Sequence, residues 1–203
     1  LSGTVVIVPL MNTSGFEFEQ ANTVWDNKDL NSLGRGSRDG TVSEQMIAAY
    51  YDDVLSRADA IIDVRTGAQW DYHHYAGVYE TGDVGRAKAL AAALGLPHVL
   101  VGQPVDQTMA CAAASEGRAV VAAYTGGGPG LRDFREEDLG YVRSAVFNAL
   151  RHLKMLSGVP QSSGVRVIKA HTFLVGSGER GFTFMDSSKR GTQVRAGDQL
   201  GYV

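Results

Sequence analysis

The stretch that decides the fold covers residues 39–67 and reads DGTVSEQMIAAYYDDVLSRADAIIDVRTG. Thr41 followed three residues later by Glu44 is the capping-box pattern that begins a helix. Apolar side chains then recur at helical spacing, at Met46, Ile47, Tyr50, Val54 and Leu55. The apolar run at residues 60–64 comes directly afterwards and predicts a buried strand. A helix that leads into a buried strand is typical of an α/β domain.

The same alternation continues on both sides of this stretch. The patterns predict helices at residues 84–94, 108–116 and 136–156, and strands at residues 98–101 and 119–123. Residues 5–9 form a β-branched run, which predicts a strand buried on both faces near the centre of the sheet. Residues 11–40 have little periodicity and are expected to form a long loop. The sequence therefore predicts a largely parallel α/β sheet.

The composition changes after Gly158. The segment VPQSSG at residues 159–164 is typical of a linker, and short strands separated by Gly-rich turns are expected at residues 165–175, 181–185 and 192–203. We therefore expect an α/β core at residues 1–158 and a small β lobe at residues 164–203. Residues 195–198 read RAGD and predict a tight turn, and Lys189 is expected to be an ordinary surface lysine.

Composition excludes several classes of function. The chain has 203 residues and a net charge of −3, with no basic run, so nucleic acid is not an expected partner. No apolar stretch is long enough to span a bilayer and no signal peptide is evident, which favours the cytoplasm. Cys111 lies in a small-residue run and is expected to be a buried structural thiol. The sequence starts at Leu1, directly before a predicted strand, and both of its ends look truncated.

Four segments together carry a resemblance to a known family. They are GTVVIVPLMNTSGF at residues 3–16, DNKDLNS at residues 26–32, the stretch at residues 39–67, and AAYTGGGPG at residues 122–130. In order and spacing they resemble the succinylglutamate desuccinylase/aspartoacylase family, a branch of the zinc carboxypeptidase superfamily. The resemblance implies a three-layer sandwich with a mostly parallel mixed sheet and a small C-terminal β lobe. It also implies a zinc-dependent hydrolase of N-acyl amino acids.

The residues that carry the chemistry in that family are replaced here. The family motif D-x-H supplies the third zinc ligand, and this chain has Asp63 and Arg65 in its place. A guanidinium stays protonated and has no lone pair for zinc. The family's catalytic glutamate corresponds to Tyr124, whose phenol is a poor base at neutral pH. The loop that supplies the other two ligands in the family is absent from this sequence, so we expect no metal cofactor for this chain.

The expected substrate-binding positions are also changed. Arginines that clamp the substrate carboxylate in the family correspond to Ala21 and Ser32. Asn31 is retained and can still donate to a carboxylate, while Arg35 or Arg65 can take over as the cation. Gly127, in the Gly-rich turn, is expected beside the same pocket. We expect Asn31, Arg65 and Tyr124 to face one shared cavity, because ligands of open α/β folds gather at one edge of the sheet.

An aromatic segment, WDYHHYAGVY at residues 70–79, has two interpretations. It is either a packed or solvated loop, or a lid that lines the pocket with Trp70, Tyr72, Tyr75 and Tyr79. The adjacent pair His73 and His74 lacks the spacing of a metal-chelating motif. The remaining histidines, His98, His152 and His171, are isolated and are expected to be structural.

Two functions remain open from the sequence. The first is a degenerate pseudoenzyme that binds a small carboxylate, an N-acyl amino acid or a partner subunit. The second is an active deacylase whose site is rebuilt or is completed by a missing segment or a second chain. The second hypothesis allows a homo-oligomer, or a hetero-oligomer with an active paralogue.

Overall fold

The structure is a computed structural model that describes residues 2–66, 74–103, 107–126, 135–161, 164–169, 184–185 and 192–202. The chain divides into two compact units, Leu1–Ala170 and His171–Val203.

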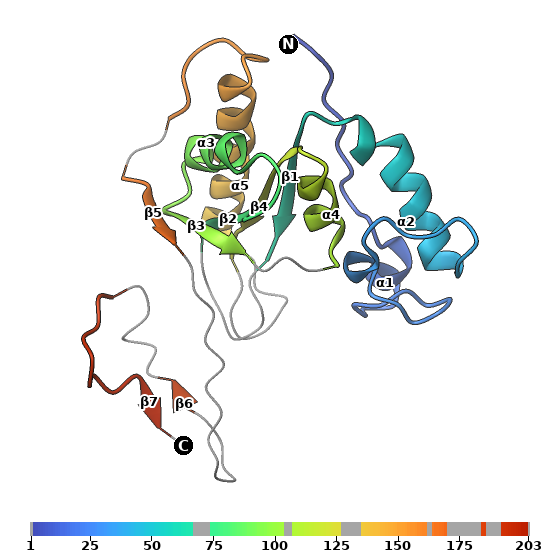
Figure 1. The fold of residues 1–203 in the computed structure, drawn as a ribbon, viewed down its shortest axis with the longest axis horizontal. Helices are drawn as coiled ribbons and strands as arrows, with labels where there is room; N and C mark the ends of the chain where they lie inside the picture. Colours follow the sequence, from blue (N-terminus) through green and yellow to red (C-terminus); the bar gives the residue numbers. More distant parts are fainter. Residues whose placement is uncertain are drawn as a thin grey trace. The chain divides into compact units, whose positions relative to one another are not determined.

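The first unit is built on a five-stranded mixed sheet (Figure 1). Its strands are β1 (Ala60–Arg65), β2 (Tyr75–Tyr79), β3 (His98–Gln103), β4 (Ala119–Tyr124) and β5 (Arg166–Lys169). They lie in the order β1-β4-β2-β3-β5. The pairs β1/β4, β2/β3 and β3/β5 are parallel, while β2 and β4 are antiparallel. The predicted α/β fold with a mostly parallel mixed sheet is confirmed.

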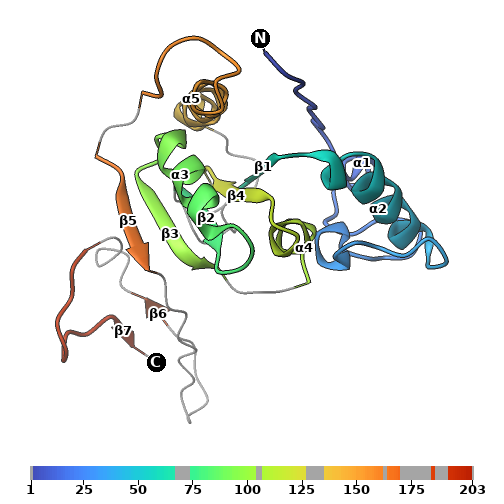
Figure 2. The ribbon, with the colours of Figure 1, turned by 45° about the horizontal axis from the view of Figure 1, so that its top comes forward.

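Helices cover both faces of this sheet (Figures 1 and 2). The α-helices are α1 (Thr13–Glu17), α2 (Val42–Asp53), α3 (Val84–Leu94), α4 (Met109–Ser115) and α5 (Glu136–His152). Two short 3-10 helices, η1 (Leu30–Leu33) and η2 (Leu55–Arg57), flank α2. Side chains of α3 and α5 share one buried cluster with the sheet, and those of α2 and α4 share a second cluster. Two apolar clusters on one sheet make a three-layer arrangement.

Local capping chemistry explains why the helices begin where the sequence predicts. Glu44 accepts a 2.7 Å hydrogen bond from the backbone N–H of Thr41, which completes the capping box of α2. Asp83 caps α3 by accepting a 2.9 Å bond from the N–H of Arg86. The same helix ends at Gly95, whose φ of +80° is the left-handed conformation that favours glycine.

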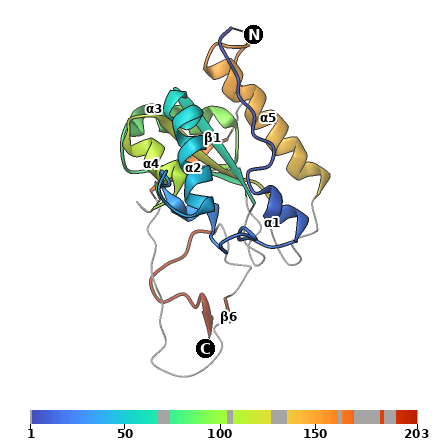
Figure 3. The ribbon, with the colours of Figure 1, turned by 90° about the vertical axis from the view of Figure 1, so that its right-hand side faces the viewer.

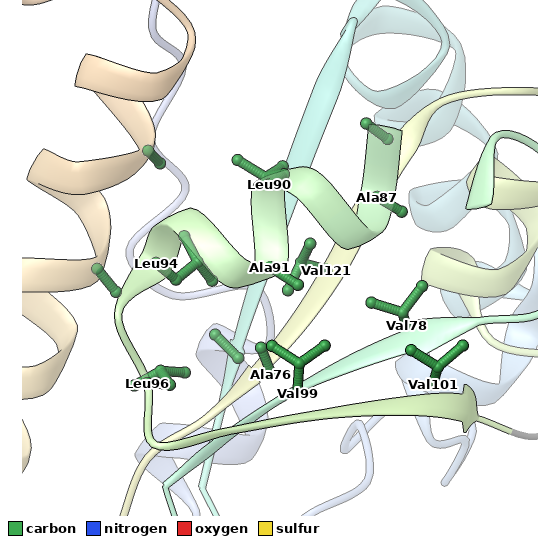
Figure 4. Close-up of a cluster of buried hydrophobic side chains, with 14 residues drawn as sticks. Ala76, Val78, Ala87, Leu90, Ala91, Leu94, Leu96, Val99, Val101 and Val121 are labelled. Atoms are coloured by element: carbon green, nitrogen blue, oxygen red, sulfur yellow. The ribbon is translucent and has the colours of Figure 1, made fainter. Parts of the chain in front are cut away.

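The larger cluster packs α3 onto the sheet (Figure 4). Leu90 and Leu94 of α3 are 1% exposed and lie over Val78, Val99 and Val121, which are fully buried. Burying each such side chain contributes about 1.5–3 kcal/mol. The packing of α3 therefore holds the middle of the sheet in place, and the ends of the strands extend beyond this packed region.

Two strand assignments differ from the sequence prediction. The predicted central strand at residues 5–9 is wrong, because residues 4–8 form neither helix nor strand and their side chains are exposed. Conversely, Tyr75–Tyr79 is not a loop but the buried strand β2, with Tyr79 only 4% exposed. Whether each segment forms a strand depends on the neighbouring strands it pairs with, and these come from distant parts of the sequence. Strand β2 has β3 and β4 beside it, and none of the described strands pairs with residues 5–9.

The C-terminal region divides later than expected. The segment expected to start the β lobe supplies β5, which pairs in parallel with β3 at the far edge of the main sheet. The compact units separate between Ala170 and His171, whereas the sequence placed the division at residues 158–164. The predicted helix at residues 136–156 ends at His152.

The second unit contains a short antiparallel pair of strands. These are β6 (Phe184–Met185) and β7 (Gly201–Tyr202). The predicted tight turn is present, since the N–H of Asp198 donates to the carbonyl of Arg195 at 3.1 Å. Lys189 and His171 lie outside the described residues.

Two further expectations can be compared with the described residues. Cys111 is 1% exposed within α4, which confirms a buried thiol. Within the described part of the chain, no helix has the length and hydrophobicity needed to cross a membrane.

Candidate functional site

The candidate site is centred on Arg65, the last residue of β1. Its Nε donates a 2.7 Å hydrogen bond to Oδ2 of Asp63, and its Nη2 donates a 2.9 Å bond to Oδ1 of Asn31. The side chains of Arg65 and Asp63 are 20% and 32% exposed, so the pair is largely removed from water. Because residues two apart in a strand lie on the same face, Asp63 is placed beside Arg65 by the strand itself.

The electrostatics keep Arg65 charged. Burial by itself lowers the pKa of the guanidinium, but the charge and hydrogen bond of Asp63 outweigh it, and the pKa is raised above its usual value. A permanently protonated arginine offers donors in a fixed planar fork that matches a carboxylate. The position can therefore attract an anion but cannot act as a base.

Tyr124 ends β4 directly beside Arg65. The two residues are register partners in the parallel β1/β4 pair, and the N–H of Thr125 donates to the carbonyl of Arg65 at 2.9 Å. The phenol oxygen of Tyr124 accepts a long 3.4 Å bond from Nη1 of Arg65. The Tyr124 ring stacks on Tyr75 with centroids 4.4 Å apart and an interplanar angle of 13°. Tyr75 was expected either in a packed or solvated loop or in a lid, and it instead begins β2, from which it supports Tyr124.

Asn31 reaches Arg65 from the 3-10 helix η1. Asp29 caps that helix, because its carboxylate accepts a 2.9 Å bond from the N–H of Asn31. The hydroxyl of Ser32 donates to the same carboxylate at 3.0 Å. Asn31 therefore faces Arg65, whereas Ser32 is exposed and bonds to Asp29.

A buried polar network anchors the loop that carries η1. Asp26 accepts hydrogen bonds from the hydroxyls of Thr23 and Ser43, and from the backbone N–H of Ser43 at 3.0 Å. Thr23 and Ser43 are fully buried. Hydrogen bonds from Ser43, then from Thr41 and Thr23, hold the pKa of Asp26 well below its usual range. The carboxylate thus ties the loop to the N-terminus of α2.

The structure does not bring every expected residue to Arg65. Arg35 forms a 3.0 Å ion pair with Glu116 and lies 4.9 Å from the centre of the Tyr51 ring. The backbone carbonyl of Ala21 accepts from Asn12 at 2.9 Å. Gly127, Trp70, Tyr72 and His73 lie outside the described residues.

A cluster around His74 was not expected from the sequence. The His74 ring stacks on Tyr141 of α5 with centroids 3.9 Å apart, and its Nε2 lies 3.4 Å from Oδ1 of Asp138. Its Nδ1 accepts a 3.4 Å bond from the N–H of Gly126. These contacts join the residue before β2, the loop that follows β4 and the first two turns of α5. The sequence carries no signal for this cluster, because its members are far apart in the chain.

The residues at this site do not fit zinc. The strand-end position that would supply a ligand holds the guanidinium of Arg65, paired with Asp63. Across the described ranges, no group of three or more His, Cys, Asp or Glu side chains is placed to hold a metal ion. The described site therefore offers a guanidinium paired with one carboxylate, an amide and a phenol, and not a metal-ligand set.

Comparison with known proteins supports the resemblance read from the sequence. The chain is 29% identical over 165 residues to N-alpha-acetyl-L-2,4-diaminobutyric acid deacetylase of Halomonas elongata, covering 78% of this chain and 47% of that protein. No family model matches the chain.

Solved structures show the same fold. A succinylglutamate desuccinylase/aspartoacylase from Rhodobacter sphaeroides superposes with a TM-score of 0.80 at 21% identity, covering 97% of this chain and 61% of that one. The product-bound ectoine utilization protein EutE (DoeB) from Ruegeria pomeroyi gives a TM-score of 0.71 at 24% identity, covering 82% and 52% of the respective chains. This chain thus spans about half to three-fifths of the length of these relatives.

Proposed function

We propose that this chain, which has the fold of the succinylglutamate desuccinylase/aspartoacylase proteins, is a degenerate relative that binds a small carboxylate and does not hydrolyse it. The observation that carries the proposal is the fixed guanidinium of Arg65 at the end of β1, held by Asp63 and Asn31. An arginine that is held in position and permanently charged favours the binding of a carboxylate and repels a divalent cation.

The hydrogen bonds of Arg65 leave donor capacity at Nη1 for such a ligand. A guanidinium has five N–H donors, and Nε and Nη2 of Arg65 are directed at Asp63 and Asn31. Among the described residues, the geometry gives Nη1 the long 3.4 Å bond to Tyr124 and no shorter one. An incoming carboxylate can accept from Nη1 and from the Tyr124 hydroxyl without breaking the contact between Arg65 and Asp63. Because Asp63 already neutralises part of the charge, we expect weak binding, with a Kd on the order of 1 mM.

Isothermal titration calorimetry on the purified chain tests the binding. The probes are acetate, succinate and N-alpha-acetyl-L-2,4-diaminobutyric acid, with acetamide as an uncharged control. Arg65→Met should weaken carboxylate binding about tenfold or more, which corresponds to about 1.4 kcal/mol. Arg38→Met is the matched control, because Arg38 pairs with Asp52 on the surface at 2.6 Å. Equal binding by acetamide, or equal loss in both variants, would contradict a carboxylate site at Arg65.

A second candidate is an active deacetylase, and the 29% identity to the Halomonas enzyme favours it. In that case the groups that hold a metal and activate water would come from outside the described residues. Zinc content measured together with hydrolysis of N-alpha-acetyl-L-2,4-diaminobutyric acid separates the two proposals. Near-stoichiometric zinc, or turnover that a chelator abolishes, would favour the active deacetylase over the binding protein. Carboxylate binding without turnover would favour the binding protein.

A further inference from the structure

A groove runs along one side of helix α5, which lies on the outside of the first unit (Figure 3). This α5 groove has a volume of about 480 Å³, in the range of sites for small molecules. Gln161, in the segment that follows α5, forms the opposite wall. The lining residues of the helix recur every three or four positions and so share one face: Gly140, Arg143, Ser144, Phe147, Asn148 and Arg151.

The two walls of the α5 groove are held together by Asn148. This side chain is 2% exposed, and its Oδ1 accepts a 2.8 Å hydrogen bond from the backbone N–H of Gln161. Its Nδ2 donates to the carbonyl of Gln161 at 2.9 Å and to the carbonyl of Leu94, at the end of α3, at 3.1 Å. The segment after α5 is therefore fixed to both helices. A groove with fixed walls binds a ligand without an ordering cost of its own.

The charged side chains of the α5 groove have one sign. Its lining includes Arg143 and Arg151, and no aspartate or glutamate is among the described residues that line it. Within the described part of the chain, neither arginine forms an ion pair. Nη1 of Arg151 lies 3.5 Å from Oδ1 of Asn148, and its guanidinium carbon lies 5.9 Å from the centre of the Phe147 ring. Two guanidinium groups without a carboxylate partner attract anions.

The spacing of these arginines favours an elongated ligand. Arg143 and Arg151 are eight positions apart, so their backbone positions are separated by about 12 Å along the helix axis. Phe147 lies midway between them in the sequence and is 41% exposed. A ligand that reaches both guanidinium groups must therefore carry an acidic group at each end and an apolar body between them. Each arginine has one positive charge, which a carboxylate matches, whereas a phosphate group adds nearly two negative charges.

We propose that the α5 groove binds an elongated organic dicarboxylate, with one acidic group at Arg143, the other at Arg151 and the apolar body on Phe147. The hydroxyl of Ser144 and the side-chain amide of Gln161 also line the groove and can donate to the carboxylate oxygens. The groove shares no residue with the candidate site at the end of β1. It therefore stands whether or not that site binds a carboxylate.

Titration of the isotope-labelled chain with suberate, a long linear dicarboxylate, tests the proposal. Backbone and side-chain amide shifts are followed by NMR at constant ionic strength, because salt screens exposed charges. The amides of Ser144, Phe147 and Gln161 should shift together, with a Kd on the order of 1 mM. Octanoate has only one acidic group and succinate is too short to reach both arginines, so both should bind about tenfold more weakly. The uncharged octanediol should cause no shift.

Single variants separate the α5 groove from other cations of the chain. Arg143→Met and Arg151→Met should each weaken suberate binding about tenfold. Arg57→Met is the matched control, because Arg57 is an exposed arginine of η2 and its loss changes the net charge equally. It should leave binding unchanged, and Arg65→Met should leave the groove shifts unchanged.

Four results would overturn the proposal. The first is the absence of shifts at the groove up to about 20 mM suberate. The second is succinate binding as tight as that of suberate, because one arginine would then suffice. The third is an equal loss in Arg57→Met, which would indicate a general effect of charge. The fourth is the disappearance of the groove shifts in Arg65→Met, which would place the ligand at the end of β1.

Discussion

Nη2 of Arg65 donates to Oδ1 of Asn31 across 2.9 Å, although the two residues are 34 positions apart in the chain. Arg65 is placed by β1, and Asn31 is placed by a loop that the Asp26 network ties to α2. The site therefore depends on two separately built supports, and a change in either one should displace the guanidinium or its acceptor. This relationship makes the site testable by substitution.

Arg65→Met should destabilise the fold by about 1–3 kcal/mol, because it removes two charge-assisted hydrogen bonds and leaves Asp63 partly buried without its cation. Asp63→Asn should cost less, since the amide can still accept from Nε. Urea denaturation of both single variants and of the double variant gives the coupling. The double variant should be less destabilised than the sum of the two single variants. Strict additivity would mean that the two side chains do not interact in solution.

The two parts of Tyr124 should contribute unequally. Tyr124→Phe removes only the hydroxyl, whose bond to Arg65 is 3.4 Å long, so the free energy of unfolding should change by less than about 0.5 kcal/mol. Tyr124→Leu also removes the stack on Tyr75 and should cost about 0.5–1.5 kcal/mol beyond the loss of buried area. Denaturant titrations of the two variants check this. A larger cost for the phenylalanine than for the leucine would show that the hydroxyl, and not the ring, holds the site.

Acid should weaken the loop anchor through Asp26. Its pKa in the folded state is held below the usual value by Ser43, Thr41 and Thr23, so the carboxylate stabilises the fold above the unfolded-state pKa of about 4. That contribution is lost as the pH falls from about 4 through the folded-state pKa. Asp26→Asn should therefore be less stable than the parent at pH 7 and should show a shallower loss on acidification. The exposed Asp39→Asn serves as the control. If the stability of Asp26→Asn and of the parent fell in parallel with pH, Asp26 would not be the cause of the acid sensitivity.

The elements predicted well from the sequence are those decided by local chemistry. The capping box at Thr41 and Glu44 begins α2, and Gly95 ends α3 at the expected residue. The strand ending at Arg65 was also predictable, because its apolar run is bounded by polar residues and needs no knowledge of its neighbours. The proximity of Arg65 and Tyr124 followed from placing strand ends at one edge of a sheet, and Asn31 reaches Arg65 from η1. That the three residues face one shared cavity stays a prediction.

The elements missed are those decided by pairing. Residues 5–9 have a stronger β-branched pattern than YAGVY at residues 75–79, yet only the latter forms a strand. The difference is that β2 lies between β3 and β4, and pattern alone does not reveal which segments find such neighbours. Arg35 was missed as a structural residue for the same reason, since its partner Glu116 is far away in the chain.

Gly126 links the end of β4 to the first turn of α5, and its substitution should be costly. Its φ is +76°, a conformation that L-residues rarely adopt, and an added Cβ would lie 2.8 Å from Oδ2 of Asp138. That carboxylate accepts from the N–H of Arg135 at 3.1 Å and also faces His74. Gly126→Ala should therefore cost about 1–3 kcal/mol of stability.

Gly140→Ala provides the matched control for Gly126→Ala. Gly140 lies exposed within α5, and an added Cβ there meets nothing within 4 Å. Because alanine has the higher helix propensity and restricts the unfolded chain, Gly140→Ala should stabilise the protein by about 0.5–1 kcal/mol. Urea titrations of both variants, with the near-ultraviolet circular dichroism of the Tyr75–Tyr124 stack as a second signal, measure the effects. A neutral Gly126→Ala with an unchanged tyrosine signal would mean that Asp138 does not pack against Gly126 in solution, and the support of the site by α5 would have to be abandoned.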